Sequence, residues 1–97
     1  MARTIRISEE ALRWLVQEAE TIARDFGGAA ARDFQTRIND AIERIAVFPG
    51  MTERGKIPGT RTFVVNRRTI LTIVERNGDL VVAAARSHRQ NGDETPL

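Results

Sequence analysis

The sequence predicts an α+β fold, in which an antiparallel pair of helices packs on one face of a roughly four-stranded, mainly antiparallel sheet. Two apolar stripes with helical spacing occupy the first half of the 97 residues, and three runs rich in Val, Ile and Thr follow in the second half. A chain of this length holds one hydrophobic core. We therefore expect a single domain over residues 1–97, with a polar tail at about 87–97.

The first elements are a short strand and a helix. Residues 4–7 alternate polar and apolar side chains, which predicts a strand with one covered face. Ser8 supplies an N-cap hydroxyl, and Glu9 and Glu10 place negative charge where the helix dipole favours it. We expect this helix to run to Gly27-Gly28, with an apolar stripe made of Leu12, Leu15, Val16, Ala19, Ile22, Ala23 and Phe26.

A second helix is predicted to end at Pro49-Gly50. Because only a glycine pair separates the two helices, we expect them to fold back on each other with both stripes facing one core. The second stripe consists of Ala30, Ala31, Phe34, Ile38, Ala41, Ile42, Ile45 and Phe48.

The second half is predicted to hold a basic loop and three strands. Residues 51–57 show no sustained period between two Pro-Gly pairs, which is typical of a loop. Strands are expected at residues 60–65, 69–75 and 80–86. Asn77-Gly78 favours a type I′ turn, so the last two strands should be adjacent and antiparallel.

Both faces of these last two strands are apolar. In the strand at 69–75, Leu71 and Ile73 are expected on one side and Ile70 and Val74 on the other; in the strand at 80–86, Leu80 and Val82 are expected opposite Val81, Ala83 and Ala85. The helices can cover only one face. We therefore expect a partner chain to cover the second face, or the sheet to curl on itself.

Trp14 lies opposite the stripe of the first helix on a helical wheel, among polar residues. It should be exposed on the isolated chain. An exposed Trp either anchors a protein contact or lies flat under neighbouring arginine stems.

Composition excludes several kinds of chemistry. The chain has no cysteine and one histidine, which excludes disulfides, thiol chemistry and ordinary zinc or iron–sulfur sites, so we expect no cofactor and no metal. No apolar run is long enough to span a bilayer and the start lacks a signal-peptide pattern, so no membrane contact and a cytoplasmic location are expected. P-loop, dinucleotide-binding and nucleophile-elbow motifs are also absent.

The candidate site is a group of basic residues. Residues 51–97 hold eight Lys or Arg against five acidic residues. If the strands at 60–65 and 80–86 share a sheet, Arg61 and residues 86–89 could line one groove for a phosphate backbone or an acidic peptide. The candidate basic residues are Arg54, Lys56, Arg61, Arg67, Arg68, Arg86, His88 and Arg89.

Ribonuclease chemistry would need a proton acceptor for the 2′-hydroxyl and cations at the phosphorus. His88 with Arg61 and Arg86 would supply these groups, with Lys56 touching phosphate. The alternative is that His88 is a surface or packing residue. Only Phe63 is left to stack a base, because the other Phe residues belong to the helix stripes.

The order strand, helix pair, basic loop and three strands resembles the RelE/ParE toxin superfamily over about residues 3–91. The residues that carry the resemblance are Phe48-Pro49, Gly55-Lys56, Pro58-Gly59-Thr60-Arg61, Val64-Val65, Asn77-Gly78 and Arg86-Ser87-His88. The resemblance implies the toxin of a type II toxin–antitoxin pair, in a hetero-oligomer with a cognate antitoxin that wraps it. Such an antitoxin would cover the second sheet face.

The superfamily has two mechanisms. ParE-like members poison DNA gyrase by protein contact, and RelE-like members cut mRNA on the ribosome. The long helices, the run Gly59-Thr60-Arg61 with Val64-Val65, and the lack of a C-terminal Tyr resemble the ParE branch. Arg68-Thr69 and Thr72 stand where ParE-like chains usually carry a Tyr-Arg pair and another Tyr, which leaves open a toxin of reduced potency.

The favoured interpretation is therefore a ParE-like gyrase inhibitor without catalytic residues of its own. Under it, Arg61, Arg86 and His88 contact the target or the antitoxin, and Trp14 and the helix pair add a further contact surface. The alternatives are a RelE-like ribosome-dependent endoribonuclease, whose partners are the ribosome and mRNA, and a small basic adaptor that binds only protein.

Overall fold

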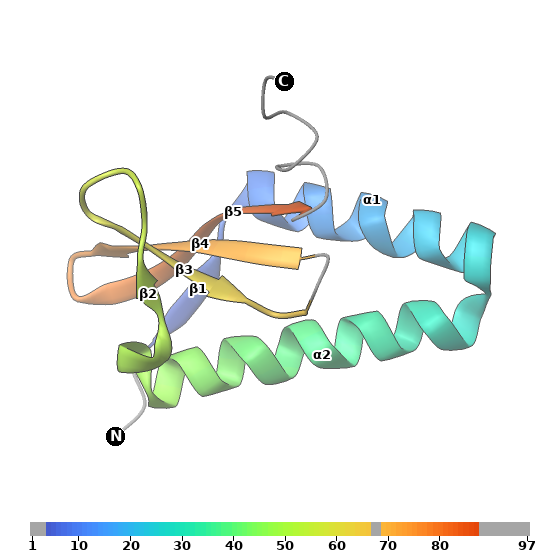
Figure 1. The fold of residues 1–97 in the computed structure, drawn as a ribbon, viewed down its shortest axis with the longest axis horizontal. Coiled ribbons are helices and arrows are strands. Elements are labelled where there is room, and N and C mark those ends of the chain that lie inside the picture. Colours follow the sequence, from blue (N-terminus) through green and yellow to red (C-terminus); the bar gives the residue numbers. More distant parts are fainter. Residues whose placement is uncertain (1–3, 67–68, 88–97) are drawn as a thin grey trace.

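The computed structural model describes residues 4–66 and 69–87 of the chain. Two helices and five strands follow one another as the α+β prediction requires (Figure 1). The elements are β1 (Ile5–Ile7), α1 (Glu9–Phe26), α2 (Gly28–Val47), the 3-10 helix η1 (Pro49–Met51), β2 (Glu53–Arg54), β3 (Thr60–Val64), β4 (Thr69–Arg76) and β5 (Asp79–Ser87).

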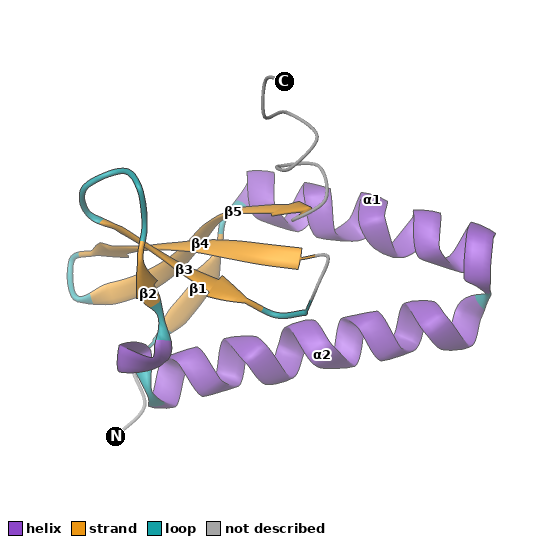
Figure 2. Ribbon diagram, viewed as in Figure 1, coloured by secondary structure: helices purple, strands orange, loops and turns teal. Residues whose placement is uncertain are grey.

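The strands form one sheet in the order β1-β5-β4-β3-β2. β1 pairs with β5 in parallel, and the other neighbours are antiparallel. The type I′ turn between β4 and β5 is confirmed, because Asn77 and Gly78 both have positive φ, 53° and 83°. Figure 2 separates the sheet from the two helices by colour.

The sequence prediction missed β2 and η1. Residues 51–57 were expected to form a loop, yet Glu53 pairs with Thr62 and Arg54 pairs with Arg61 at the edge of the sheet. A pairing of two residues is too short to produce a hydrophobic period. The sheet therefore has five strands rather than four.

The helix pair is confirmed, with Gly27 as its turn. Gly27 has φ 98°, a conformation that other residues rarely adopt, and its N–H donates to the carbonyl of Ala23 at 2.9 Å. At the other end of α1, Ser8 Oγ accepts from the N–H of Ala11 at 3.0 Å. The same hydroxyl donates to the carbonyl of Ala83 in β5 at 2.8 Å, which fixes the start of α1 to the sheet.

The core lies between the helix pair and one face of the sheet, here called the covered face. Ala11, Leu15 and Ala19 are the buried residues of α1. From the strands come Leu71, Ile73, Leu80, Val82 and Ala85, and from α2 Phe34, Ile38 and Ile45. Ile45, Leu71, Ile73 and Val82 are at most 1% exposed. This packing fixes the position of the sheet, including its edge strand β2.

The expected orientation of α1 was wrong by part of a turn. Trp14, predicted to be exposed, is half-buried and packs against the core. Leu12 and Val16, predicted to be core residues, are 50% and 49% exposed. The helix buries the arc centred on Ala11 and Leu15, so Trp14 lies at one margin of that arc and Leu12 at the other.

A β-bulge changes which residues of β5 face the core. Thr72 pairs with Ala84 but the next residue, Ile73, pairs with Val82, so Ala83 has no partner in β4. The extra residue turns Ala85 onto the covered face, where it is 8% exposed. The sequence prediction placed Ala85 on the opposite face because simple alternation does not include bulges.

The second face of the sheet, here called the open face, is less apolar than predicted. Of its large apolar residues only Val64 is more than half exposed. Its threonines and Arg86 interrupt the apolar surface. By strand pairing, the open face carries Thr60, Thr62, Val64, Ile70, Thr72, Val74, Val81, Ala84 and Arg86.

Candidate functional site

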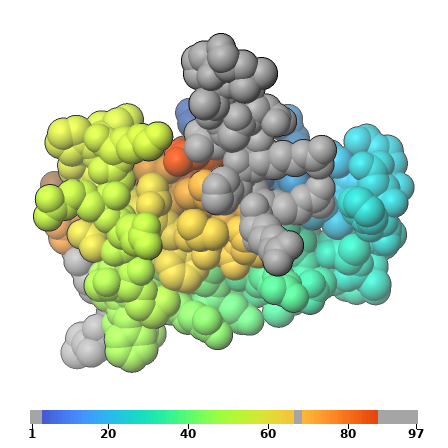
Figure 3. All heavy atoms as spheres, viewed as in Figure 1, coloured from blue at the N-terminus to red at the C-terminus, as the bar shows by residue number. Residues whose placement is uncertain are grey.

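The loop between β2 and β3 has a defined shape. The N–H of Gly55 donates to the carbonyl of Thr60 at 2.8 Å, and the hydroxyl of Thr60 donates to the carbonyl of Ile57 at 2.6 Å. Gly59 has φ 85° and follows Pro58, as position i+2 of a type II turn requires. A Cβ at Gly55 would collide with Thr60. The loop therefore depends on glycine at two positions, and Figure 3 shows it projecting at one end of the molecule.

A cavity of about 410 Å³, here called the loop pocket, lies between this loop and the open face. Its walls combine cations, hydroxyl groups and one exposed isoleucine. They contain no carboxylate. The lining residues are Arg54, Gly55, Lys56, Ile57, Thr60, Thr62, Thr72 and Arg86.

Arg86 is the half-buried cation of the loop pocket. Its Nη1 donates to Thr72 Oγ1 across the β4–β5 pair at 3.4 Å, a long hydrogen bond. Its Nε is buried and has no hydrogen-bond partner among the residues that the structure describes. A buried guanidinium N–H without an acceptor is costly to the folded chain.

Arg61 lies on the other side of the sheet. It pairs with Ile73, whose side chain is in the core, so the Arg61 side chain leaves β3 on the covered face. Its Nε donates to Thr52 Oγ1 at 2.5 Å and its Nη2 to the Thr52 carbonyl at 2.6 Å. Thr52 Oγ1 in turn donates to the carbonyl of Pro49. Arg61 and Arg86 therefore do not line one groove, contrary to the expectation from the sequence.

The remaining predicted site residues fall into two groups. Arg54 and Lys56 are exposed, and both line the loop pocket. Arg67, Arg68, His88 and Arg89 lie outside the described residues, so their predicted roles stay predictions. Among the described residues, no three His, Cys, Asp or Glu side chains gather closely enough to hold a metal ion.

An apolar groove on the helix pair was missed by sequence reasoning. Leu12 and Val16 of α1 and Ile7 of β1 form its exposed rim, and the cavity between them and α2 measures about 270 Å³. Sequence periodicity assigned Leu12 and Val16 to the core and therefore hid them. The groove, here called the helix groove, is lined by Ile7, Leu12, Leu15, Val16, Phe34, Gln35, Ile38 and Asn39.

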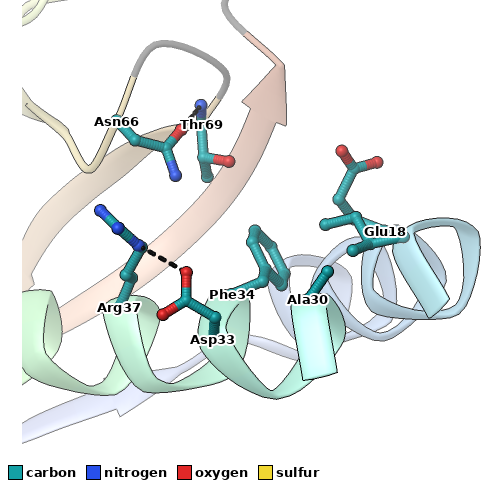
Figure 4. A pocket seen from close by; sticks show the side chains of 8 residues that line it. Glu18, Ala30, Asp33, Phe34, Arg37, Asn66 and Thr69 are labelled. Atoms are coloured by element: carbon teal, nitrogen blue, oxygen red, sulfur yellow. Dashed lines mark hydrogen bonds and ion pairs between the residues drawn. The ribbon is translucent and has the colours of Figure 1, made fainter. Parts of the chain in front are cut away.

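A further cavity of about 500 Å³ lies between the two helices and the end of β3 (Figure 4). Arg37 donates to Asp33 at 2.9 Å along α2, and the N–H of Thr69 donates to Asn66 Oδ1 at 3.0 Å. The hydroxyl of Thr69 is buried without a partner. Phe34 and Ile22 contribute apolar lining, and the charged pair Asp33 and Arg37 is bonded within α2.

No helix in the described part of the chain is both long and apolar enough to cross a membrane.

Comparisons with known structures agree with the fold. The first similar structure is described as the chromosomal ParDE TA system from P. aeruginosa; it has a TM-score of 0.79 and 11% identity, and the match covers 89% of this chain and 96% of that one. A second is the E. coli DinJ-YafQ toxin-antitoxin complex, with a TM-score of 0.61 and 14% identity, covering 93% of this chain and 97% of the other.

Comparisons of sequence give a family but no individual relative. No curated protein matches the chain. The family model described as the ParE toxin of the type II toxin-antitoxin system, parDE, matches residues 5–92, which is nearly the whole sequence. Together with the helix pair on a five-stranded sheet, this match shows that the chain belongs to the ParE toxin family of type II toxin–antitoxin systems.

Proposed function

We propose that this toxin inhibits DNA gyrase by protein–protein contact and that a cognate antitoxin neutralises it. The family match over residues 5–92 is the observation that carries the proposal. The geometry supports contact rather than catalysis, because the lining of the loop pocket contains no His, Asp, Glu, Tyr or Cys to act beside Lys56. The exposed cations Arg54 and Lys56 are target contacts in this proposal.

The helix groove supports an antitoxin partner. Leu12, Val16 and Ile7 expose apolar side chains around a cavity that α1 and α2 hold open. Gln35 and Asn39 at its margin offer hydrogen-bond donors and acceptors. Apolar rims with a few polar groups suit the apolar face of an amphipathic helix. We infer that a helical segment of the antitoxin binds here.

The alternative of a ribonuclease depends on joint action of Arg61, Arg86 and His88. Arg61 donates from Nε and Nη2 to Thr52, and its side chain lies on the face opposite Arg86. These two arginines therefore have no common position for one phosphate. This separation supports the gyrase inhibitor over the endoribonuclease.

The test of the target is a gyrase assay. Purified toxin is added to gyrase, ATP and relaxed plasmid, and we expect loss of supercoiling with accumulation of linear, covalently trapped DNA. The same preparation is added to a ribosomal translation reaction, where mRNA should stay intact. Shortened mRNA without any effect on gyrase would reverse the choice between the two functions.

The test of the partner uses the small acidic protein that the proposal expects an adjacent reading frame to encode. Adding this protein should restore supercoiling. Val16→Lys should weaken its binding by about tenfold or more, because a charge would be buried against apolar side chains. Gln17→Lys adds the same charge on an exposed neighbouring position and should bind normally. Equal binding by the two variants would exclude the helix groove as the antitoxin surface.

A further inference from the structure

We propose that the cavity between the two helices and the end of β3, here called the hairpin pocket, binds a small organic ammonium ion. The ligand class is a primary amine carried on a short apolar body. The volume of the pocket, about 500 Å³, lies within the range of small-molecule sites. The inference goes beyond the proposed function, because it depends neither on gyrase nor on the antitoxin.

The wall of the hairpin pocket is largely apolar. Phe34 of α2 is buried, Ile22 of α1 is half-buried, and Ala30 adds a third apolar side chain. Figure 4 shows Phe34 and Ala30 on one side of the cavity and Thr69 on the other. Such a wall stabilises a bound ligand by removing its apolar surface from water. The pocket therefore suits an alkyl or aromatic body rather than a hydrated inorganic ion.

Glu18 supplies the charge that selects a cation. The rotation of α1 that half-buries Trp14 also turns Glu18, one helical turn further on, towards the hairpin pocket, where it too is half-buried. Among the described residues, no cation pairs with its carboxylate. A half-buried carboxylate attracts a cation more strongly than one in open solvent, because the effective dielectric constant around it is lower.

The remaining charges of the lining do not reverse this preference. Arg37 Nε donates to Asp33 Oδ2 at 2.9 Å, so the guanidinium already has a carboxylate beside it. Glu18, Asp33 and Arg37 are the charged residues of the lining, and negative charge exceeds positive charge by one. We therefore expect the pocket to prefer a cation to an anion.

Thr69 gives the pocket a buried polar group without a partner. By alternation along β4 it shares the covered face with Leu71 and Ile73, so its side chain points towards the helices. Its Oγ1 is buried and makes no hydrogen bond within the described part of the chain. In Figure 4 this oxygen points away from Asn66, towards the side where Glu18 lies. An ammonium N–H that donates to Oγ1 satisfies this acceptor.

The helix groove is the rival site for an apolar ligand, and it lacks these polar features. Among the described residues that line it, none is charged, and its polar side chains are Gln35 and Asn39. Phe34 lines both cavities. A ligand selected only by its apolar body has no reason to prefer one cavity, whereas an ammonium group should direct it to the hairpin pocket.

The test is a titration of the ¹⁵N-labelled full chain followed by amide chemical shifts. Phenethylamine, a cation at neutral pH, should give saturable shifts at Glu18, Ala30 and Thr69, and Leu12 and Asn39 of the helix groove should shift little. Phenethyl alcohol has the same shape without the charge and should bind about fivefold more weakly. Phenylacetate reverses the charge and ethylamine lacks the ring, so each should bind at least about tenfold more weakly.

Variants assign the binding to the pocket. Glu18→Gln should weaken phenethylamine binding by about fivefold and change that of phenethyl alcohol by less than about twofold, because only the amine is charged. Glu20→Gln is the matched control, because it removes the same charge from an exposed position of α1 and should change affinity by less than about twofold. Thr69→Val should weaken amine binding by about threefold without lowering the midpoint of urea unfolding, since the lost hydroxyl has no partner.

The proposal fails if phenylacetate or ethylamine binds as tightly as phenethylamine, or if Glu18→Gln and Glu20→Gln lose affinity equally. It also fails if the shifts centre on Leu12 and Asn39, because the amine then occupies the helix groove. A titration without saturation below about 10 mM phenethylamine would likewise overturn it. If Thr69→Val does not fold, Glu18→Gln decides alone, because its side chain is only half-buried.

Discussion

Arg61 and Arg86 are the same residue type on two strands of one sheet, yet their surroundings differ. The Arg61 side chain extends from the covered face of the sheet and donates two short hydrogen bonds to Thr52. Arg86 lies on the open face, where its Nε has no acceptor within the described residues. The first arginine joins the segment between η1 and β2 to β3, and the second has an N–H that no described group accepts. Charge alone, read from the sequence, cannot separate an arginine bonded within the fold from one that is not.

The two faces of the sheet differ in the same way as the two arginines that they carry. The covered face is packed against both helices, and the open face mixes threonines and Arg86 with apolar residues. We therefore expect truncations on the covered face to affect stability, and changes on the open face to affect binding.

The largest difference is expected between Leu71→Ala and Val81→Ala. Leu71 is fully buried, so its truncation leaves a cavity and should lower the free energy of unfolding by about 2–5 kcal/mol. Val81 is half-buried on the open face and should cost about 1 kcal/mol or less. Urea unfolding followed by circular dichroism measures both. Similar losses would mean that the open face is packed as tightly as the covered one.

A smaller difference is expected between the two arginines. Arg61→Met removes charged hydrogen bonds to a buried threonine and should lower the free energy of unfolding by about 2 kcal/mol. Arg86→Met removes an N–H that has no acceptor, so stability should change by about 0.5 kcal/mol or less. The measurement is again chemical denaturation.

Thr52→Val provides the check on Arg61. It removes the hydroxyl that Arg61 contacts, so its cost should not add fully to that of Arg61→Met in the double variant. Full additivity would show that the Arg61–Thr52 contact contributes nothing to stability.

The smallest difference concerns two glycines near the β2–β3 loop. Gly55→Ala places a methyl group against Thr60, and should lower the free energy of unfolding by about 1–2 kcal/mol. Gly50→Ala meets no atom within 4 Å and should be nearly neutral. The midpoint of thermal unfolding compares the two variants. Equal midpoints would show that the loop adapts freely.

Much of the fold could be predicted from local sequence signals. Both helices were predicted from the apolar periods, Ser8 and the glycine pair, and the β4–β5 turn was predicted from Asn77-Gly78. These features depend on residues close together in the chain. The polar residues at the ends of each element and its apolar face are enough to predict that element without knowing which other elements it packs against.

The errors arose where distant residues decide the outcome. The rotation of α1, which buries Trp14 and exposes Leu12, depends on how the helix rests on α2 and β5. The bulge at Ala83 depends on the register of two strands. β2 forms only because β3 offers its edge. The hydrophobic period of a single segment does not show which distant segment it will pair with.

The candidate site was predicted in part. The sequence named Lys56 and Arg86 among the candidate basic residues, and the structure places both in the lining of the loop pocket, while their roles stay predictions. It also grouped Arg61 with them, because a list of basic residues does not tell which face of a strand each one occupies. The strand pairing of Arg61 with Ile73 supplies that missing information.

The parallel pairing of β1 with β5 has a consequence for how the toxin is made. Ser8 bonds to a carbonyl 75 positions later, so the N-terminal strand has no partner until the last strand leaves the ribosome. Contacts between the two ends of a chain form late and slow folding. The sheet therefore cannot be completed until the residues of β5 have been synthesised and have left the ribosome.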